Sequence, residues 1–138
     1  MIDVVSERGR AGTTVAHVVA RSGISRRTFY EVFDDFEDCF LAALDRSLAC
    51  VSQYVLDAYD PEERWRIQIR AALAGALEFL DDEPAMGRLC IVETLGAGHR
   101  VQERRLAVMD IMVAAVDEGR KQSRSASALP PLTGEGVV

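Results

Sequence analysis

Two neighbouring arginines and a tyrosine carry the most distinctive chemistry in this sequence. When the segment that holds them is drawn as a helix at about 100° per residue, one arc of roughly 140° is shared by Arg26, Arg27, Tyr30 and Glu31. Phe29 and Val32 lie on the other side, so we expect both to pack inward. An arginine pairs with phosphate and can donate two parallel hydrogen bonds to O6 and N7 of guanine. The pattern indicates a helix that buries one side and presents a nucleic-acid-reading side to solvent.

A second short helix is predicted just ahead of this one. Its apolar face is formed by residues spaced at i, i+3 and i+4, namely Val15, Val18 and Val19. Either Thr13 or Thr14 can cap its start, because a hydroxyl there accepts from an unpaired backbone N–H. Gly23 favours the left-handed conformation that ends a helix, and Ser25 is placed to cap the helix that follows. Two helices joined by such a turn have the geometry that places the second helix in the major groove of DNA.

We expect six residues of this unit to contact DNA: Thr14, Ser25, Arg26, Arg27, Thr28 and Tyr30. The hydroxyls of Thr14 and Ser25, at the starts of the two helices, would hold phosphates. Tyr30 would contact the DNA backbone or a thymine methyl group; a half-buried aromatic that closes the domain is its alternative role. Thr28 lies off the exposed arc, so local capping is at least an equal alternative for it. For the two arginines the alternative is an ordinary solvated surface.

The composition favours an all-helical protein. Apolar residues make up 49% of the 138 residues, which is enough for a sizeable core. Proline is scarce before residue 130, where only Pro61 and Pro84 occur, and the alternation typical of strands is absent. We therefore predict an all-α fold.

The same composition argues against several other classes of protein. Cys39, Cys50 and Cys90 are dispersed and odd in number, which favours a reducing cytoplasm over a disulfide framework. No apolar run reaches the ~18 residues of a membrane span, and no signal peptide precedes the fold. The histidines and cysteines lack metal-ligand spacing, and no phosphate-binding glycine loop or nucleophile motif occurs. We expect a cytoplasmic protein that is not an enzyme and has no cofactor, metal site or membrane partner.

The charge is distributed unevenly along the chain. The net charge is −6, which by itself opposes binding to DNA. Residues 8–30 nevertheless contain five arginines and no acid, whereas residues 31–45 contain six acids and no lysine or arginine. The basic part coincides with the predicted helix-turn-helix, so we expect the acidic remainder to face away from phosphate.

Residues 1–45 resemble the DNA-binding domain of the tetracycline-repressor (TetR) family of transcription regulators. The matching residues are Glu7-Arg8-Gly9, Gly12-Thr13-Thr14-Val15, Val19-Ala20, Ser22-Gly23-Ile24-Ser25, Thr28-Phe29-Tyr30, Phe33 and Phe40-Leu41-Ala42-Ala43. The resemblance implies a three-helix helix-turn-helix domain at 1–45, joined by a long helix to a helical ligand-binding and dimerisation domain at 46–138. It implies a homodimeric, ligand-responsive repressor whose partners are a double-stranded DNA operator and an unknown small-molecule effector. Family members usually carry a lysine where Phe36 stands and often a histidine where Val32 stands, so the backbone contacts differ from the family pattern.

Four further helices are predicted after the helix-turn-helix. Apolar spacing and turn signals place them at about 34–59, 60–82 with Pro61 at its first position, 84–95 and 100–121. The expected inward residues of the 60–82 helix are Trp65, Ile69, Leu73, Leu77 and Leu80. The expected apolar face of the last helix is Val101, Val108, Met109, Met112, Val113 and Val116. From residue 122 the composition is that of a loop.

Apolar faces of these helices supply the candidate effector-binding residues. They are Tyr54, Trp65, Phe79, Met86, Cys90 and Met109. The resemblance implies that helices of this domain enclose a ligand. An ordinary place in the hydrophobic core is the alternative for each of the six.

The resemblance also implies one or two further helices for dimerisation, and none follows here. We therefore expect an incomplete regulator that is truncated near Val138, with a first helix shortened by about a turn or two. An alternative function follows from these departures: a truncated helical interaction module that pairs with a full-length regulator and does not itself bind DNA. Specific, salt-sensitive binding to DNA discriminates between the two.

Overall fold

The computed structural model describes residues 1–122, and in that part of the chain all regular structure is helical. The elements in order are α1 (Ile2–Arg8), α2 (Val15–Ser22), α3 (Arg26–Val32), α4 (Phe36–Ala58), α5 (Trp65–Asp82), α6 (Pro84–Arg88), a short π-helical segment η1 (Leu89–Glu93) and α7 (His99–Gln122). The predicted all-α class is confirmed. The predicted loop beyond residue 122 lies outside the described residues.

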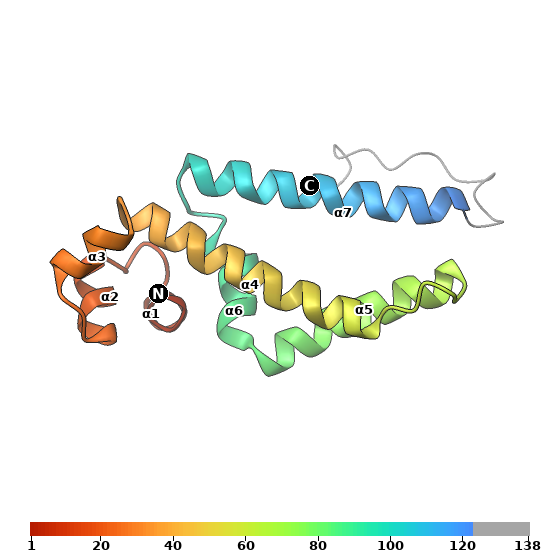
Figure 1. Ribbon diagram of the computed structural model, residues 1–138, viewed down its shortest axis with the longest axis horizontal. Helices are drawn as coiled ribbons and strands as arrows, with labels where there is room; N and C mark the ends of the chain where they lie inside the picture. The colour runs from red at the N-terminus through yellow and green to blue at the C-terminus, as the bar shows by residue number, and fades with distance from the viewer. Residues whose placement is uncertain (123–138) are drawn as a thin grey trace.

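Helices α1, α2 and α3 form a small head at one end of the molecule (Figure 1). Gly9 ends α1 and Gly23 ends α2, both with a positive φ of 72° that glycine adopts without strain; Gly23 alone of the two has the left-handed helical conformation. The fully buried side chains of Val5, Phe29 and Phe40 anchor the head on the start of α4. The turn signals in the sequence therefore fix the ends of the first two helices as predicted.

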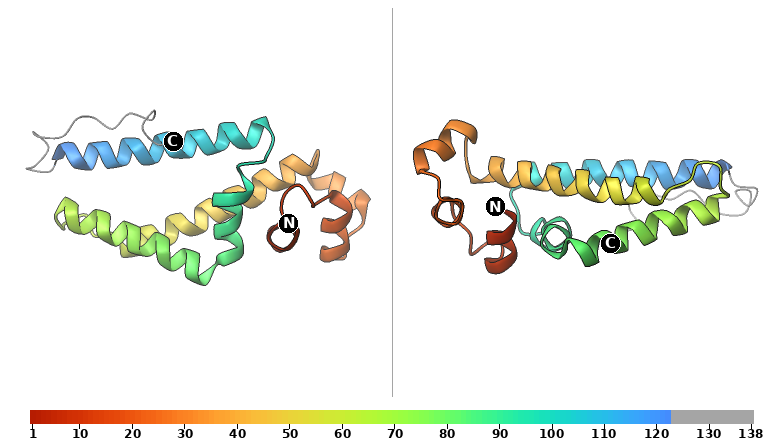
Figure 2. Two further views of the ribbon diagram at one scale, coloured as in Figure 1. Left: turned by 180° about the vertical axis from the view of Figure 1, so that it is seen from behind. Right: turned by 60° about the horizontal axis from the view of Figure 1, so that its bottom comes forward.

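Helix α4 extends from the head along the body of the molecule (Figures 1 and 2). Asp35 caps it, with Oδ1 accepting the N–H of Asp38 at 2.7 Å. The predicted stripe is buried at Phe40 and Leu44. Within residues 1–122, α4 is also the one helix whose length and composition would allow it to cross a membrane, a test that core helices of soluble proteins also pass.

Helix α5 begins later than the sequence indicates. Pro61 is not at its first position, because residues 59–64 form a turn and the helix starts at Trp65. The Asp60 carboxylate accepts the N–H of Glu62 at 2.9 Å, and the Gln68 side chain donates to the Pro61 carbonyl at 3.0 Å. These bonds satisfy the backbone in a turn, which competes with a capped helix start.

The buried side of α5 is not the one that its leucines suggest. Leu73 and Leu77, which we expected to face inward, are 59% and 63% exposed, while Gly75 and Phe79 are buried. A Cβ on Gly75 would lie 2.5 Å from the Tyr54 carbonyl oxygen, so the backbones of α4 and α5 approach more closely than a leucine would permit. Close packing on the small residue therefore decides the orientation of the helix.

We expect Gly75→Leu to lower the free energy of unfolding by about 3 kcal/mol, because the new side chain must displace the α4 backbone. For a chain of this size the melting temperature should fall by about 10 °C. The matched control is Ala74→Leu, since Ala74 is the exposed neighbour on the same helix. Thermal unfolding followed by circular dichroism measures both variants, and equal melting temperatures would refute the proposed close contact.

Helix α6 begins at Pro84 as predicted, and α6 and η1 bring the chain back to the head. Residues 94–98 then form a turn, and α7 runs away from the head alongside α4 (Figure 1). A Cβ on Gly98 would collide with the Glu37 carboxylate, so the predicted glycine break is also a point of contact with α4. On α7, Val101 is fully buried, whereas Met112 is 62% exposed and does not pack in the core as expected.

Candidate nucleic-acid interface

Helix α3 is held by its cap and by one buried aromatic side chain. The Oγ of Ser25 accepts the N–H of Thr28 at 3.0 Å, and the two hydroxyl oxygens are also 3.0 Å apart. The Thr28 hydroxyl is therefore used in the local cap, which was one of its two predicted roles. Phe29 is 1% exposed and packs against Phe33 at a ring separation of 5.4 Å. The opposite side of α3 is thereby fixed toward solvent.

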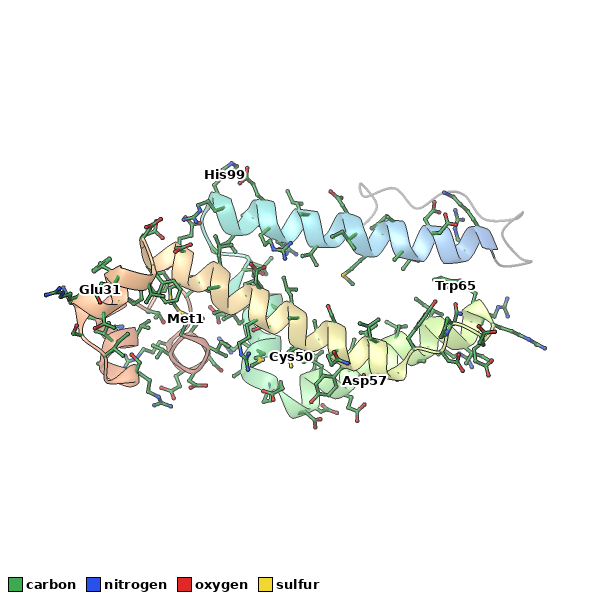
Figure 3. The ribbon with its side chains drawn as sticks, viewed as in Figure 1. Met1, Glu31, Cys50, Asp57, Trp65 and His99 are labelled. Carbon is green, nitrogen blue, oxygen red and sulfur yellow. The ribbon has the colours of Figure 1, made fainter. Side chains whose placement is uncertain are left out.

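That outer side presents two arginines and a tyrosine. Arg26 and Arg27 are both exposed, and Tyr30 is 56% exposed with its ring at right angles to Phe29. The Arg27 Nε lies 2.9 Å from a Glu31 carboxylate oxygen, with 89% and 57% of the two side chains exposed. An exposed pair at this spacing contributes only about 0.3–0.5 kcal/mol, so the Arg27 guanidinium is available to a stronger partner. Figure 3 places Glu31 at the outer end of the head.

Val32 does not pack inward as we expected, because it is 66% exposed. The buried arc of α3 is centred between Phe29 and Phe33, which are four residues apart. Val32 lies about 80° from that centre at 100° per residue, outside the arc. The sequence projection therefore located the exposed side of α3 correctly and made the buried side too wide.

Two other arginines of the basic segment have structural roles. The Arg10 guanidinium lies over the Phe36 ring at 4.3 Å from its centroid. Arg21 pairs with Glu7 at 3.2 Å. The aromatic residue at position 36 is thus used in packing. The exposed arginines of the basic segment are Arg8, Arg21, Arg26 and Arg27, and the last two are neighbours on α3.

The start of α2 shows a role that the sequence did not suggest for His17. The N–H of Thr14 lies 3.3 Å from Nδ1 of His17, and the Thr14 hydroxyl lies equally close to it. A side-chain acceptor three residues after the cap is the arrangement of a capping box, in which glutamate or glutamine is usual. The T-x-x-H spacing is the signal that could have indicated it. Thr14 remains exposed, as a phosphate contact requires.

The six candidate effector-binding residues lie in four separate places. Tyr54 and Phe79 stack edge to face at 5.8 Å, and the Tyr54 hydroxyl donates to Asp82 at 3.0 Å, a bond that raises the pKa of the tyrosine. Trp65 lies near Gly119 at the end of α5 that is remote from the head (Figure 3). Met86 faces a groove beside the head. Cys90 and Met109 alone share one cleft.

This cleft lies between α4, η1 and α7 and has a volume of about 280 Å³. One side is formed by Leu44, Leu48, Val51, Cys90, Ile91 and Thr94. Arg105 and Met109 are among the α7 residues that complete it. Burial raises the pKa of the Cys90 thiol to about 11, so the thiol is protonated at neutral pH and the cleft wall there is uncharged.

A buried carboxylate connects the cleft region to the head. Glu93 is 7% exposed; one of its oxygens accepts the backbone N–H of Arg10 at 2.6 Å and the other accepts from Arg88 at 2.9 Å. Sequence reasoning missed this residue. Its signal is an acid within the apolar run LCIVETL, where a charge is retained only if it is paired.

Within residues 1–122, no three histidine, cysteine or acidic side chains gather as a metal ion would require.

Comparison with known proteins gives one match. Residues 2–43 match the family model of bacterial regulatory proteins, tetR family. No curated protein matches the chain, and neither does any solved structure.

Proposed function

We propose that this chain, whose residues 2–43 match the family model of bacterial regulatory proteins, tetR family, is a DNA-binding transcription regulator of that family and acts as a ligand-responsive repressor in the form of a homodimer. The observation that carries this proposal is the outer side of α3, where Arg26, Arg27 and Tyr30 face solvent while Phe29 anchors the helix. The family match covers α1 to α3 and the start of α4, so it includes this surface.

In the proposed complex, α3 enters the major groove of the operator. One of Arg26 and Arg27 donates to O6 and N7 of a guanine, an interaction worth about 1–3 kcal/mol of discrimination. The other arginine pairs with phosphate, and Tyr30 contacts the backbone or a thymine methyl group. Ser25 and Thr14 hold phosphates through their exposed hydroxyls. The Arg27–Glu31 pair contributes less free energy than a contact with guanine. It is therefore favourable for Arg27 to leave Glu31 and bind the base.

The effector acts through the cleft between α4, η1 and α7. Cys90, Ile91 and Thr94 line this cleft, and Glu93 of the same segment holds the backbone at Arg10. A ligand that binds one arrangement of η1 more tightly than another shifts the equilibrium between the two arrangements. The size of that shift equals the difference in binding free energy, and the position of the head follows it. Segments with π-helical hydrogen bonding, like η1, are frequent at functional sites. The cytoplasm is the proposed compartment, because the operator is chromosomal DNA.

Selection of genomic fragments by the purified protein tests this function. A homodimer should enrich inverted half-sites whose centres are separated by about one helical turn or a multiple of it. Binding should weaken steeply as salt rises, because arginine–phosphate contacts release counterions. If no sequence is enriched above the input and binding is insensitive to salt, the proposal is wrong.

A second function is favoured by one specific observation. Leu73 and Leu77 on α5 and Leu106 and Ile111 on α7 are each more than half exposed. Such side chains suit a helical interaction module that pairs with another chain and does not itself bind DNA. Absence of DNA selection, together with a stable complex between the chain and a full-length regulator, would support this alternative.

A further inference from the structure

The cleft between α4, η1 and α7 combines apolar walls with one cation. Its lining includes Leu44, Leu48 and Val51 from α4, and among residues 1–122 Arg105 is its only charged lining residue. No acid of this described part of the chain lines the cleft. The walls therefore favour a hydrocarbon or aromatic body, and the only full charge that they offer is positive.

Arg105 differs from the arginines beside it on α7. Arg104 pairs with Asp45 at 2.6 Å, and Arg100 pairs with Asp38 at 3.3 Å. In the part of the chain that the structure describes, Arg105 makes no ion pair, although it is half-buried against the apolar wall. A half-buried guanidinium next to an apolar surface is stabilised by an anion that reaches it.

The other polar groups of the cleft have their own partners. The Thr94 hydroxyl donates to the Cys90 carbonyl at 2.9 Å, and the Gln102 side chain donates to the Thr94 carbonyl at 2.6 Å. Because these groups already have hydrogen-bond partners within the protein, they do not need one from a ligand. A fitting ligand needs one anionic group at the Arg105 end and an apolar remainder.

The volume sets the size of that remainder. A cavity of about 150 Å³ holds one benzene molecule, so a cleft of about 280 Å³ has space for roughly ten to twelve non-hydrogen atoms. We propose that this cleft binds a small carboxylic acid with an apolar body of that size, whose carboxylate pairs with Arg105. This assignment rests on the proposed function, because it names the chemical class of the effector that the regulator would sense.

Calorimetric titration of the full chain with decanoate tests the assignment, with decanol as the neutral ligand of the same chain length. We expect decanoate to bind on the order of tenfold more tightly than decanol, because only the acid gains a charge-assisted bond. In Arg105→Met, which keeps an unbranched side chain and removes the charge, the two ligands should bind equally. The matched control is Arg66→Met on the exposed start of α5, which should keep the preference. Ile91→Trp should weaken the binding of both ligands, because an indole ring is larger than the isoleucine side chain and occupies part of the cleft.

Equal affinity of the wild type for decanoate and decanol would overturn the assignment, and so would a preference that survives in Arg105→Met. Circular dichroism melts show that each variant remains folded. DNA selection is measured on the same preparations. If decanoate does not bind while DNA is still selected, the ligand assignment fails and the regulator proposal stands; if decanoate binds and no DNA is selected, the regulator proposal fails instead.

Discussion

The double variant Arg26→Ala/Arg27→Ala is expected to bind the selected operator about a hundredfold more weakly at fixed salt, on the order of 3 kcal/mol. The two side chains are exposed on α3, and in the proposed complex they supply the guanine contact and an adjacent phosphate contact. Changing both at once matters, because Arg26 is the nearest cation that could replace Arg27 when the latter is paired with Glu31. Fluorescence anisotropy with labelled operator measures the change in affinity.

The control for this variant is Arg66→Ala/Arg70→Ala on α5. It removes the same charge from another exposed helix, so it reports the general effect of net charge on binding. We expect it to retain most of the affinity. Arg26→Ala/Arg27→Ala should also show a shallower salt dependence. The slope of log binding constant against log salt concentration should be smaller by about 0.9 for each arginine–phosphate pair that the substitution removes. An unchanged isotherm in Arg26→Ala/Arg27→Ala would remove α3 from the interface.

Glu93→Ala is expected to lower the free energy of unfolding by about 3 kcal/mol. The carboxylate is 7% exposed and accepts from both Arg10 and Arg88, so its removal leaves a backbone N–H and a guanidinium without their acceptor. For a chain of this length the melting temperature should fall by about 10 °C. Urea unfolding of the variant and of the wild type measures the difference.

The matched control is Glu78→Ala, which removes an exposed acid from α5 and should change stability by less than about 0.5 kcal/mol. Below its melting temperature, Glu93→Ala should also bind operator with reduced response to effector, because η1 no longer holds the backbone at Arg10. A variant that melts with the wild type would show that the Glu93 hydrogen bonds do not couple the body to the head.

The sequence predicted those features that depend on local chemistry. Gly9 and Gly23 end their helices, Ser25 caps α3, and Pro84 begins α6, because each signal acts on backbone groups within a few residues. The outer side of α3 was located for the same reason, since a helical projection requires only the chain itself.

The features that sequence reasoning placed wrongly or missed all depend on which neighbour a helix meets. The leucines of α5 and Val32 of α3 are apolar, yet they lie outside. Helix α5 instead packs on Gly75, which has no side chain, and α3 packs on Phe29. Glu93 could not be assigned from the sequence, because its partner at Arg10 is 83 residues away along the chain. The cleft with Arg105 was likewise hidden, since α4, η1 and α7 meet only in the folded protein.

The proposed function depends most on the entry of α3 into the major groove. Protection of guanine N7 from methylation by dimethyl sulfate tests this directly, because N7 is exposed in the major groove and is one of the two acceptors for an arginine. On a selected operator, the wild type should protect a guanine in each half-site, and Arg26→Ala/Arg27→Ala at saturating concentration should leave that guanine reactive. Binding of the wild type without any N7 protection would contradict the proposed insertion of α3.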